Sequence, residues 1–266
     1  MISAAVCALA LLAGCCRGYD EDLEKGAAAI AAARSDTERA TGYTRRGRGY
    51  SEKARYLRAF KRIARPEYDQ LFALAIKDLD QAVALAPADA QTFLERGEAY
   101  YSRAYPGPPD DWETKDEVAP WAALAVADFS RAAERDANLE QAYDMRGLVH
   151  TNLEDYDAAI EDFEQVQRIN PAFGKTRLAA AYCARGARDG EKNLYDVAVA
   201  DYEKARELGA PTEGCECDPY WGLAALYLDH EHDADKSWDI VHAAKGKGYI
   251  PPEFLAHLRQ VSGRDG

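Results

Sequence analysis

The chain has 266 residues, of which 47% are hydrophobic and 30% charged, and its formal net charge is −13. Hydrophobic residues at this level supply a core, which excludes a chain that is disordered throughout and favours one large or two small globular domains. The surplus of acidic residues argues against a general nucleic-acid-binding protein, because phosphate groups require a basic surface.

The first eighteen residues form a segment of their own. The apolar run from Ala4 to Ala13 is too short to span a bilayer but has the length of a signal-peptide core. It ends in Leu12-Ala13-Gly14-Cys15, which resembles the lipobox of bacterial lipoproteins. In that family a diacylglycerol is attached to the cysteine and the chain is cleaved before it. No basic residue precedes Ala4, which departs from the usual signal.

The lipobox resemblance implies a signal peptide over 1–14, a lipid-attached Cys15 and a linker over 15–21. It also implies export to the bacterial cell envelope and a lipid-anchored membrane location, the outer membrane if the host is Gram-negative. The alternatives are an ordinary secretory signal, which also implies export, and a buried helix.

Basic residues are concentrated further along the chain. Nine Lys or Arg and one Glu lie between Ala40 and Arg65, so the remainder is strongly acidic. Either the segment 45–65 is a membrane-surface module that contacts anionic lipid, or it is a basic outer face paired with acidic neighbours. We favour the paired face.

Two patterns recur along the chain. The first is an aromatic residue, then any two residues, then Arg-Gly, then any two residues and a second ring-bearing residue. It occurs at Tyr43–Tyr50, Phe93–Tyr100 and Tyr143–His150. The second lies downstream of the first and reads AIEDFEQVQRINP in its third copy. Its copies are Ala75–Pro87, Ala125–Ala137, Ala159–Pro171 and Ala198–Ala210. Together they resemble the two helices of a tetratricopeptide repeat, a 34-residue helical hairpin. The copy that ends at Pro171 fits without a gap.

The resemblance implies an all-α fold, an α-solenoid wound as a right-handed superhelix of about five hairpins, because a single hairpin cannot bury its apolar face. The repeat domain covers 22–262. We expect capping helices over 22–36 and 252–262, and repeats over 40–89, 90–139, 140–173, 174–212 and 218–250.

Repeats one and two are longer than the standard repeat, and the extra residues lie between their helices. In repeat one the insert continues both helices, with a break at Pro66, and predicts a hairpin that projects from the stack. In repeat two the run from Pro106 to Pro109 predicts an irregular loop that carries Tyr105 and Trp112. These rings either pack against the first hairpin, which we favour, or belong to a binding face.

An arginine precedes each repeat glycine, at Arg46, Arg96 and Arg146, and an aspartate precedes each ring of the second helix. We expect the pairs Arg46–Asp78, Arg96–Asp128 and Arg146–Asp162 to bridge the two helices as structural ion pairs. Repeat four has Ala180 in the arginine position, so Arg177 is the expected partner of Asp201.

In this family the first helices form a concave wall that binds proteins or peptides. Counting from each repeat start predicts the following positions on that wall: Thr41, Thr44, Arg48, Ser51, Gln91, Leu94, Glu98, Tyr101, Gln141, Asp144, Leu148, Thr151, Lys175, Leu178, Tyr182 and Arg185. The set is mixed and modestly apolar, which predicts an extended segment or helix of a partner protein.

No pattern predicts catalysis, a cofactor or a metal. A phosphate loop, a nucleophile elbow and a zinc-protease motif are absent from the sequence, and its carboxylates are spread as on solvated helix faces. Cys183, Cys215 and Cys217 leave a disulfide open, and His230 and His232 lack a third ligand. The sequence therefore predicts a non-enzymatic protein-binding adaptor; a metal- or redox-linked accessory protein is a remote alternative.

Overall fold

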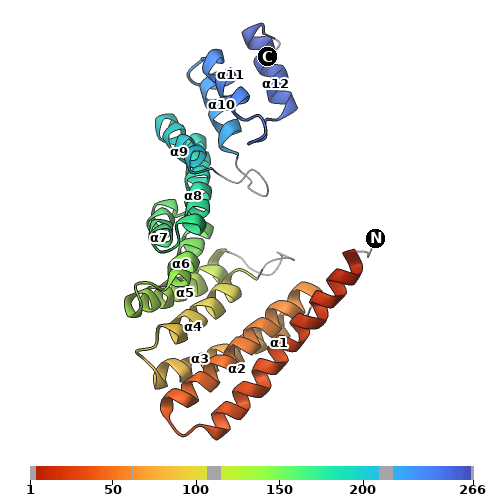
Figure 1. Cartoon of the computed structure of the whole chain (residues 1–266), viewed down its shortest axis with the longest axis vertical. Coiled ribbons are helices and arrows are strands. Elements are labelled where there is room, and N and C mark those ends of the chain that lie inside the picture. Colours follow the sequence, from red (N-terminus) through yellow and green to blue (C-terminus); the bar gives the residue numbers. More distant parts are fainter. Residues whose placement is uncertain (1–3, 62, 107–114, 210–217, 265–266) are drawn as a thin grey trace. The chain divides into compact units, whose positions relative to one another are not determined.

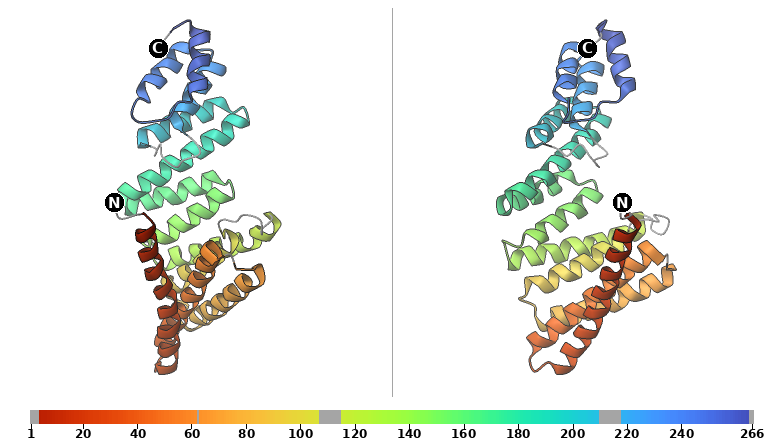
Figure 2. Two further views of the ribbon diagram at one scale, coloured as in Figure 1. Left: turned by 90° about the vertical axis from the view of Figure 1, so that its right-hand side faces the viewer. Right: turned by 45° about the vertical axis from the view of Figure 1, so that its right-hand side comes forward.

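The computed structural model describes residues 4–61, 63–106, 115–209 and 218–264, and side chains from Gly18 onward except those of Lys61 and Lys115 (Figure 1). Every regular element in these ranges is a helix. The helices form two compact units, residues 1–149 and 150–266, which are described separately. Within each unit, consecutive helices pair as antiparallel hairpins, so the predicted all-α fold of stacked hairpins is confirmed (Figure 2).

The first unit begins with α1 (Ala4–Ala32), which packs along α2 (Asp36–Tyr56). Glycines make this contact close: a Cβ on Gly49 would lie 3.0 Å from the Tyr19 carbonyl oxygen. The capping helix predicted over 22–36 lies in the second half of α1, and it ends at Ala32. Helix α2 begins at Asp36, earlier than the predicted repeat start, because the Ser35 hydroxyl accepts a hydrogen bond from the Glu38 N–H at 3.1 Å.

The predicted long hairpin of repeat one is present, but it does not project from the unit. Helix α2 passes through a π-helical turn, Leu57–Lys61, and α3 (Arg65–Leu85) starts with a proline in its first turn. The start of α3 is held by the second repeat: the Tyr68 hydroxyl donates to the Ser102 carbonyl oxygen at 2.8 Å, and Arg103 contacts Asp69 at 2.9 Å. The added turns of the first repeat are thus buried by its neighbour.

The second repeat consists of α4 (Ala90–Ala104) and α5 (Lys115–Arg135), followed by α6 (Glu140–Asn152). Phe93, Leu94 and Phe129 lie at the centre of its core. Gly97 lets α5 approach, because a Cβ there would lie 2.6 Å from the Phe129 ring. A small residue at the crossing of the two helices is what the repeat pattern requires.

The second unit contains α7 (Tyr156–Ile169), α8 (Pro171–Glu191), α9 (Tyr195–Leu208), α10 (Pro219–Asp229), α11 (Ala234–Ala243) and α12 (Pro252–Ser262). Pro171 separates α7 from α8, as expected of a proline at the first helical position. Helix α12 is the predicted closing cap, and its Leu258 is buried against Leu228 and Trp238.

Candidate partner-binding surfaces

Two of the predicted arginine–aspartate pairs are confirmed within the first unit. Arg46 Nε donates to Asp78 Oδ2 at 2.6 Å, and Arg96 Nε donates to Asp128 Oδ2 at 2.7 Å. A second hydrogen bond of 2.8 Å from Nη2 makes each pair bidentate. Hydrogen bonding to Asp128 raises the pKa of Arg96 above its ordinary value. These arginines connect the two helices of their own repeats, so they are structural. Arg146 and Asp162 belong to different units, and their pairing stays a prediction.

The prediction for repeat four is wrong. Asp201 is bound by Arg185, with Nε and Nη2 each 2.7 Å from a carboxylate oxygen, and not by Arg177. The Arg–Asp separation is 16 residues here and 32 in the two long repeats, a difference that equals the length of their inserts. Arg185 therefore occupies the position of Arg46 and Arg96.

Gly186 gives independent support for this register. A Cβ on Gly186 would lie 3.3 Å from the Ala198 carbonyl oxygen and from the Tyr202 ring. Gly47 has the matching neighbours in repeat one, Ala75 and Leu79. The sequence signal was present: Tyr182, Arg185 and Gly186 repeat the pattern aromatic, two residues, Arg-Gly. Counting repeat four from Gly174 therefore placed its inner face five residues too early.

The corrected register moves the inner face of α8. The positions that correspond to the predicted wall are now Ala180, Cys183, Ala187 and Gly190. Leu178 is 2% exposed and belongs to the core, and Arg185 is engaged by Asp201 and Asp157, so neither presents itself to a ligand. Tyr182 is half-buried and takes the aromatic position of the repeat.

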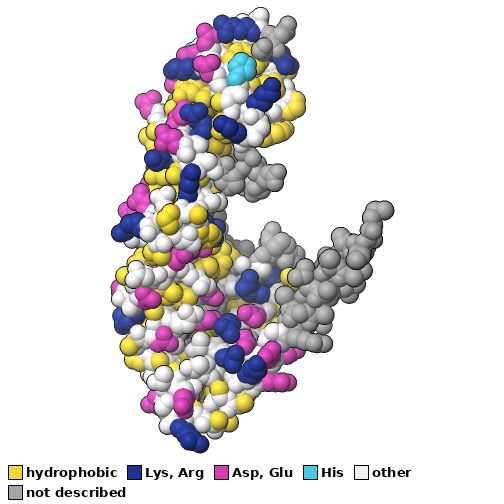
Figure 3. All heavy atoms as spheres, viewed as in Figure 1, with side chains coloured by type: hydrophobic (Ala, Val, Ile, Leu, Met, Phe, Trp, Pro, Cys, Tyr) yellow, Lys and Arg dark blue, Asp and Glu magenta, His cyan; other side chains and the backbone are white. Residues whose placement is uncertain are grey.

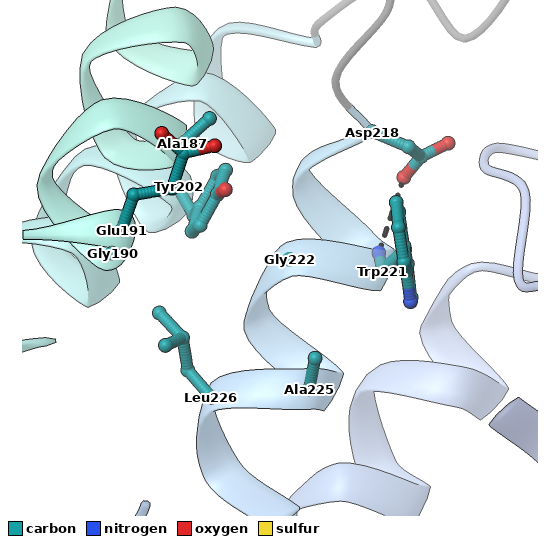
Figure 4. Close-up of a pocket in the computed structure, with 9 residues that line it drawn as sticks. All are labelled: Ala187, Gly190, Glu191, Tyr202, Asp218, Trp221, Gly222, Ala225 and Leu226. Atoms are coloured by element: carbon teal, nitrogen blue, oxygen red, sulfur yellow. Dashed lines mark hydrogen bonds between the residues drawn. The ribbon is translucent and has the colours of Figure 1, made fainter. Parts of the chain in front are cut away.

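A pocket opens on this inner face, between α8 and α10 (Figure 4). It has a volume of about 350 Å³. We call it the α8–α10 pocket and define it by its lining residues Ala187, Gly190, Glu191, Tyr202, Asp218, Trp221, Gly222, Ala225 and Leu226. Ala187 has a small side chain and Gly190 has none, and this leaves the space open.

Helix α10 is fixed beside this pocket by its cap. The Asp218 carboxylate accepts hydrogen bonds from the N–H groups of Tyr220 at 2.8 Å, Trp221 at 3.3 Å and Tyr249 at 2.6 Å. Gly222 is required, since a Cβ there would lie 2.4 Å from the Tyr202 ring. The described lining residues therefore come from helices and from the N-cap of α10.

The inner face of the first unit is polar instead. Arg48 donates to Asp22 of α1 at 2.9 Å and to Glu95 at 3.4 Å, and Gln141 donates to Glu98 at 2.5 Å. The pKa of Glu98 is raised to about 7. Burial is the main cause of this higher pKa and the charge of Glu95 adds to it, while the hydrogen bond from Gln141 opposes the shift. Burial also raises the pKa of Glu95. Burial thus shifts the pKa of both carboxyl groups in the same direction.

The other predicted wall residues have different surroundings. Leu94 is 0% exposed and Asp144 is also buried, so the prediction is wrong in placing them within reach of a partner. Leu94 packs into the core because the close crossing at Gly97 draws α4 against its neighbours. The half-buried positions are Thr44, Tyr101, Leu148 and Thr151.

Glu98 predicts a specific pH dependence of stability. Between the ordinary carboxyl pKa and about 7, folded Glu98 keeps a proton that the unfolded chain has lost, so its contribution to stability falls as pH rises through this window. We expect Glu98→Gln to stabilise the protein at pH 8 by about 3 kcal/mol, from about 1.4 kcal/mol for each unit of pKa, and to have little effect at pH 5. Urea unfolding at both pH values measures the difference.

The matched control for this prediction is Glu134→Gln, because Glu134 is exposed on α5. It should change stability equally at pH 5 and pH 8. A pH-independent effect of Glu98→Gln would show that this carboxyl is not protonated in the folded state near neutral pH.

The basic segment 45–65 is paired with acidic neighbours, as favoured from the sequence. Arg45 and Arg48 contact Asp22, Lys53 lies 3.8 Å from Asp20, and Arg65 contacts Glu117 at 2.7 Å. Arg58 is 1% exposed and lies over the Tyr68 ring. In the space-filling view, acidic and basic side chains are intermingled over the helices of this unit (Figure 3). The charge available to an anionic lipid surface is correspondingly small.

Tyr105 caps the C-terminus of α4 and is half-buried beside Tyr101, with ring centroids 5.2 Å apart. Burial raises the pKa of Tyr105 to about 12. It packs against the core of the second repeat, whereas the sequence favoured packing against the first hairpin. Trp112, the other ring of the insert, lies outside the described residues, as do Cys215 and Cys217; the side chain of Cys15 also lies outside them.

Metal-binding clusters and membrane-spanning helices are both absent from the described part of the chain. No group of three His, Cys, Asp or Glu side chains is placed there to hold a metal ion. Among the helices described, none is both long and apolar enough to cross a membrane. His230 stacks on Tyr195 at the end of α10, and Cys183 is buried in the core of the second unit.

The family comparison agrees with the geometry. Residues 140–173 match the family model described as tetratricopeptide repeat, the same segment that the sequence pattern fits without a gap. The segment is thus similar to a tetratricopeptide repeat, and repeats of this kind bind proteins or peptides. No curated protein matches the chain in sequence.

Solved structures give likenesses of fold alone. MamA is 21% identical, with a TM-score of 0.47, and the match covers 71% of this chain and 88% of MamA. A thermophilic repeat protein of Thermus thermophilus is 19% identical, with a TM-score of 0.40 and coverages of 71% and 91%. YrrB, a repeat protein with an unusual peptide-binding site, is 13% identical, with a TM-score of 0.41 and coverages of 81% and 86%.

Proposed function

We propose that this chain is a non-enzymatic scaffold that binds a partner protein on the inner faces of its repeats. The observation that carries the proposal is the α8–α10 pocket, which opens at inner-face positions of repeats four and five. Stacked repeats use such surfaces for binding, and the ion pairs Arg46–Asp78 and Arg96–Asp128 hold the two helices of each long repeat together.

We also propose that the protein is exported and anchored in the bacterial envelope through a lipid on Cys15. The apolar run from Ala4 to Ala13 and the lipobox-like residues before Cys15 support this. The anchor would keep the repeats at a membrane surface, where they recruit partner proteins.

The anchor makes a direct prediction. In a bacterial host that processes lipoproteins, the wild-type chain should incorporate a fatty-acid label and fractionate with membranes. Cys15→Ser should lose the label and move to the supernatant, whereas Cys16→Ser should behave as the wild type. Equal labelling of wild type and Cys15→Ser would contradict attachment at this residue.

Binding on the inner face is tested by site-specific photocrosslinking. A photoreactive residue placed at Tyr101, in the first unit, or at Ala187, in the second, should give discrete adducts in envelope extract. The same residue at Lys77, which is exposed on the second helix of repeat one, is the control. Equal adducts from all three positions would contradict inner-face binding.

A further inference from the structure

We propose that the α8–α10 pocket takes one large apolar side chain of an extended partner segment that carries lysine or arginine beside it. This inference rests on the proposed scaffold function and specifies the chemistry of the partner. It follows from the size of the pocket, the nature of its walls and the sign of its charge.

The size of the pocket sets the scale of the occupant. Its volume of about 350 Å³ is at the small end of the range for ligand sites, which begins near about 300 Å³. That space accepts one aromatic or branched aliphatic side chain with part of its backbone. A large cofactor does not fit.

The walls are suited to an apolar side chain. Tyr202 and Leu226 line the pocket, together with the methyl groups of Ala187 and Ala225. Trp221 stands at α10 with 42% of its surface exposed, although a tryptophan side chain is usually well buried. A partner side chain placed here would cover the exposed indole and remove apolar area from water.

The described residues that line the pocket belong to α8, α9 and α10 and to the N-cap of α10. The Tyr202 ring packs directly against Gly222, where a side chain would clash with it. Gly190 faces open space, because a Cβ there would meet only Ala198 at 3.9 Å. The hydrogen bonds of Asp218 hold the start of α10 in place. A partner therefore meets a preformed site, which reduces the entropic cost of binding.

The charge of the pocket is acidic. Among the described lining residues, Glu191 and Asp218 are charged and none is basic. The Asp218 carboxylate is used by backbone N–H groups, whereas Glu191 is exposed at the end of α8. Residues 150–266 carry 22 acidic and 13 basic residues, so the surrounding field also attracts cations. A basic residue beside the apolar anchor complements both features.

The test uses three fluorescein-labelled peptides of the same length. The first has the sequence Ser-Lys-Lys-Phe-Lys-Lys-Ser, the second replaces every Lys by Glu, and the third replaces Phe by Ser. Fluorescence anisotropy with the full chain at low and at physiological salt gives the affinities. We expect the first peptide to bind at least about tenfold more tightly than either of the others, a difference of about 1.4 kcal/mol.

Substitutions in the pocket test whether the first peptide binds there. Ala225→Leu fills the space and should abolish binding of the first peptide, and Glu191→Lys should weaken it at least about threefold through charge repulsion. Glu161→Lys, a matched change at an exposed site on α7, should leave the affinity unchanged apart from a small long-range effect. Circular dichroism and the thermal midpoint show that each variant is folded. Because Glu191 and Glu161 are both exposed, this pair keeps the test valid if Ala225→Leu does not fold.

Several outcomes would overturn the proposal. Equal binding of the Lys and Glu peptides would show that charge does not select the partner, and equal binding of the Phe and Ser peptides would exclude an apolar anchor. Equal effects of Glu191→Lys and Glu161→Lys would place the peptide elsewhere. If the peptides do not bind but crosslinking from Tyr101 succeeds, the scaffold function stands and the chemistry proposed for this pocket is wrong. If crosslinking from both inner positions also fails, the scaffold function is wrong as well.

Discussion

Replacing Asp128 by alanine is expected to lower the free energy of unfolding by about 3 to 5 kcal/mol, among the largest effects of any single change in this chain. Asp128 is 2% exposed and holds Arg96, whose side chain is 12% exposed, through two hydrogen bonds. Without the carboxylate, the guanidinium is left largely buried and only Asp80, at 2.7 Å, remains to compensate its charge. Urea denaturation of the variant and the wild type measures the loss.

A second variant separates the charge effect from lost packing. Arg96→Leu combined with Asp128→Ala removes both charges, and Leu is the residue that the repeat pattern prefers at this position. We expect the double variant to be more stable than Asp128→Ala alone, because an uncompensated buried charge costs more than the absence of the pair. Arg131→Ala is the control: Arg131 also contacts Asp128, at 3.4 Å, but it is mostly exposed and should contribute less than about 1 kcal/mol. A double variant no more stable than Asp128→Ala would contradict the interpretation of Arg96–Asp128 as a buried structural ion pair.

Gly174→Ala should destabilise the second unit by about 3 kcal/mol. A Cβ at Gly174 would lie 2.2 Å from both the backbone nitrogen and the Cα of Gln167, so α7 and α8 would have to separate. Backbone atoms cannot turn aside as a flexible side chain can, and the cost therefore exceeds the gain from the better helix propensity of alanine. Thermal or urea unfolding checks this.

The control for Gly174 lies in the same helix. Gly190 is also within α8, but its nearest neighbour to a new Cβ is Ala198 at 3.9 Å, an ordinary contact. Gly190→Ala should stabilise the protein by up to about 1 kcal/mol, because alanine loses less conformational entropy in a helix. Opposite signs for the two substitutions would confirm that helix crossing, and not helix propensity, decides at Gly174. The same sign for both would refute that explanation.

Much of the fold could be predicted from the sequence. The Arg-Gly pattern and the apolar spacing identify the helical hairpins, and they also predict the bridges Arg46–Asp78 and Arg96–Asp128. These features are local to one hairpin, whose two helices follow each other in the chain and pack together. Periodicity is sufficient for them, because it states which face of each helix is apolar.

The candidate site was less predictable, and repeat four shows why. Counting from Gly174 ignored the motif at Tyr182, Arg185 and Gly186, so the inner face was assigned to Leu178, which is buried, and to Arg185, which is a brace. The extra residues at the start of α8 do not disturb its helical period, so periodicity alone does not reveal them. The motif itself, the neighbours of Gly186 and the partner of Asp201 together fix the register.

The sequence by itself determined the helical hairpins and the uneven charge, whereas export stays a proposal. The tertiary structure decided which polar residues are buried and where a pocket opens. Asp22 reaches Arg48, and Arg103 reaches Asp69, across helices that no short-range pattern connects. The pocket depends on the fit of α8 against α10, which the ring of Tyr202 and the missing side chain of Gly222 set together. The burial of a side chain depends on how several helices pack together, so it cannot be predicted from the sequence of one helix.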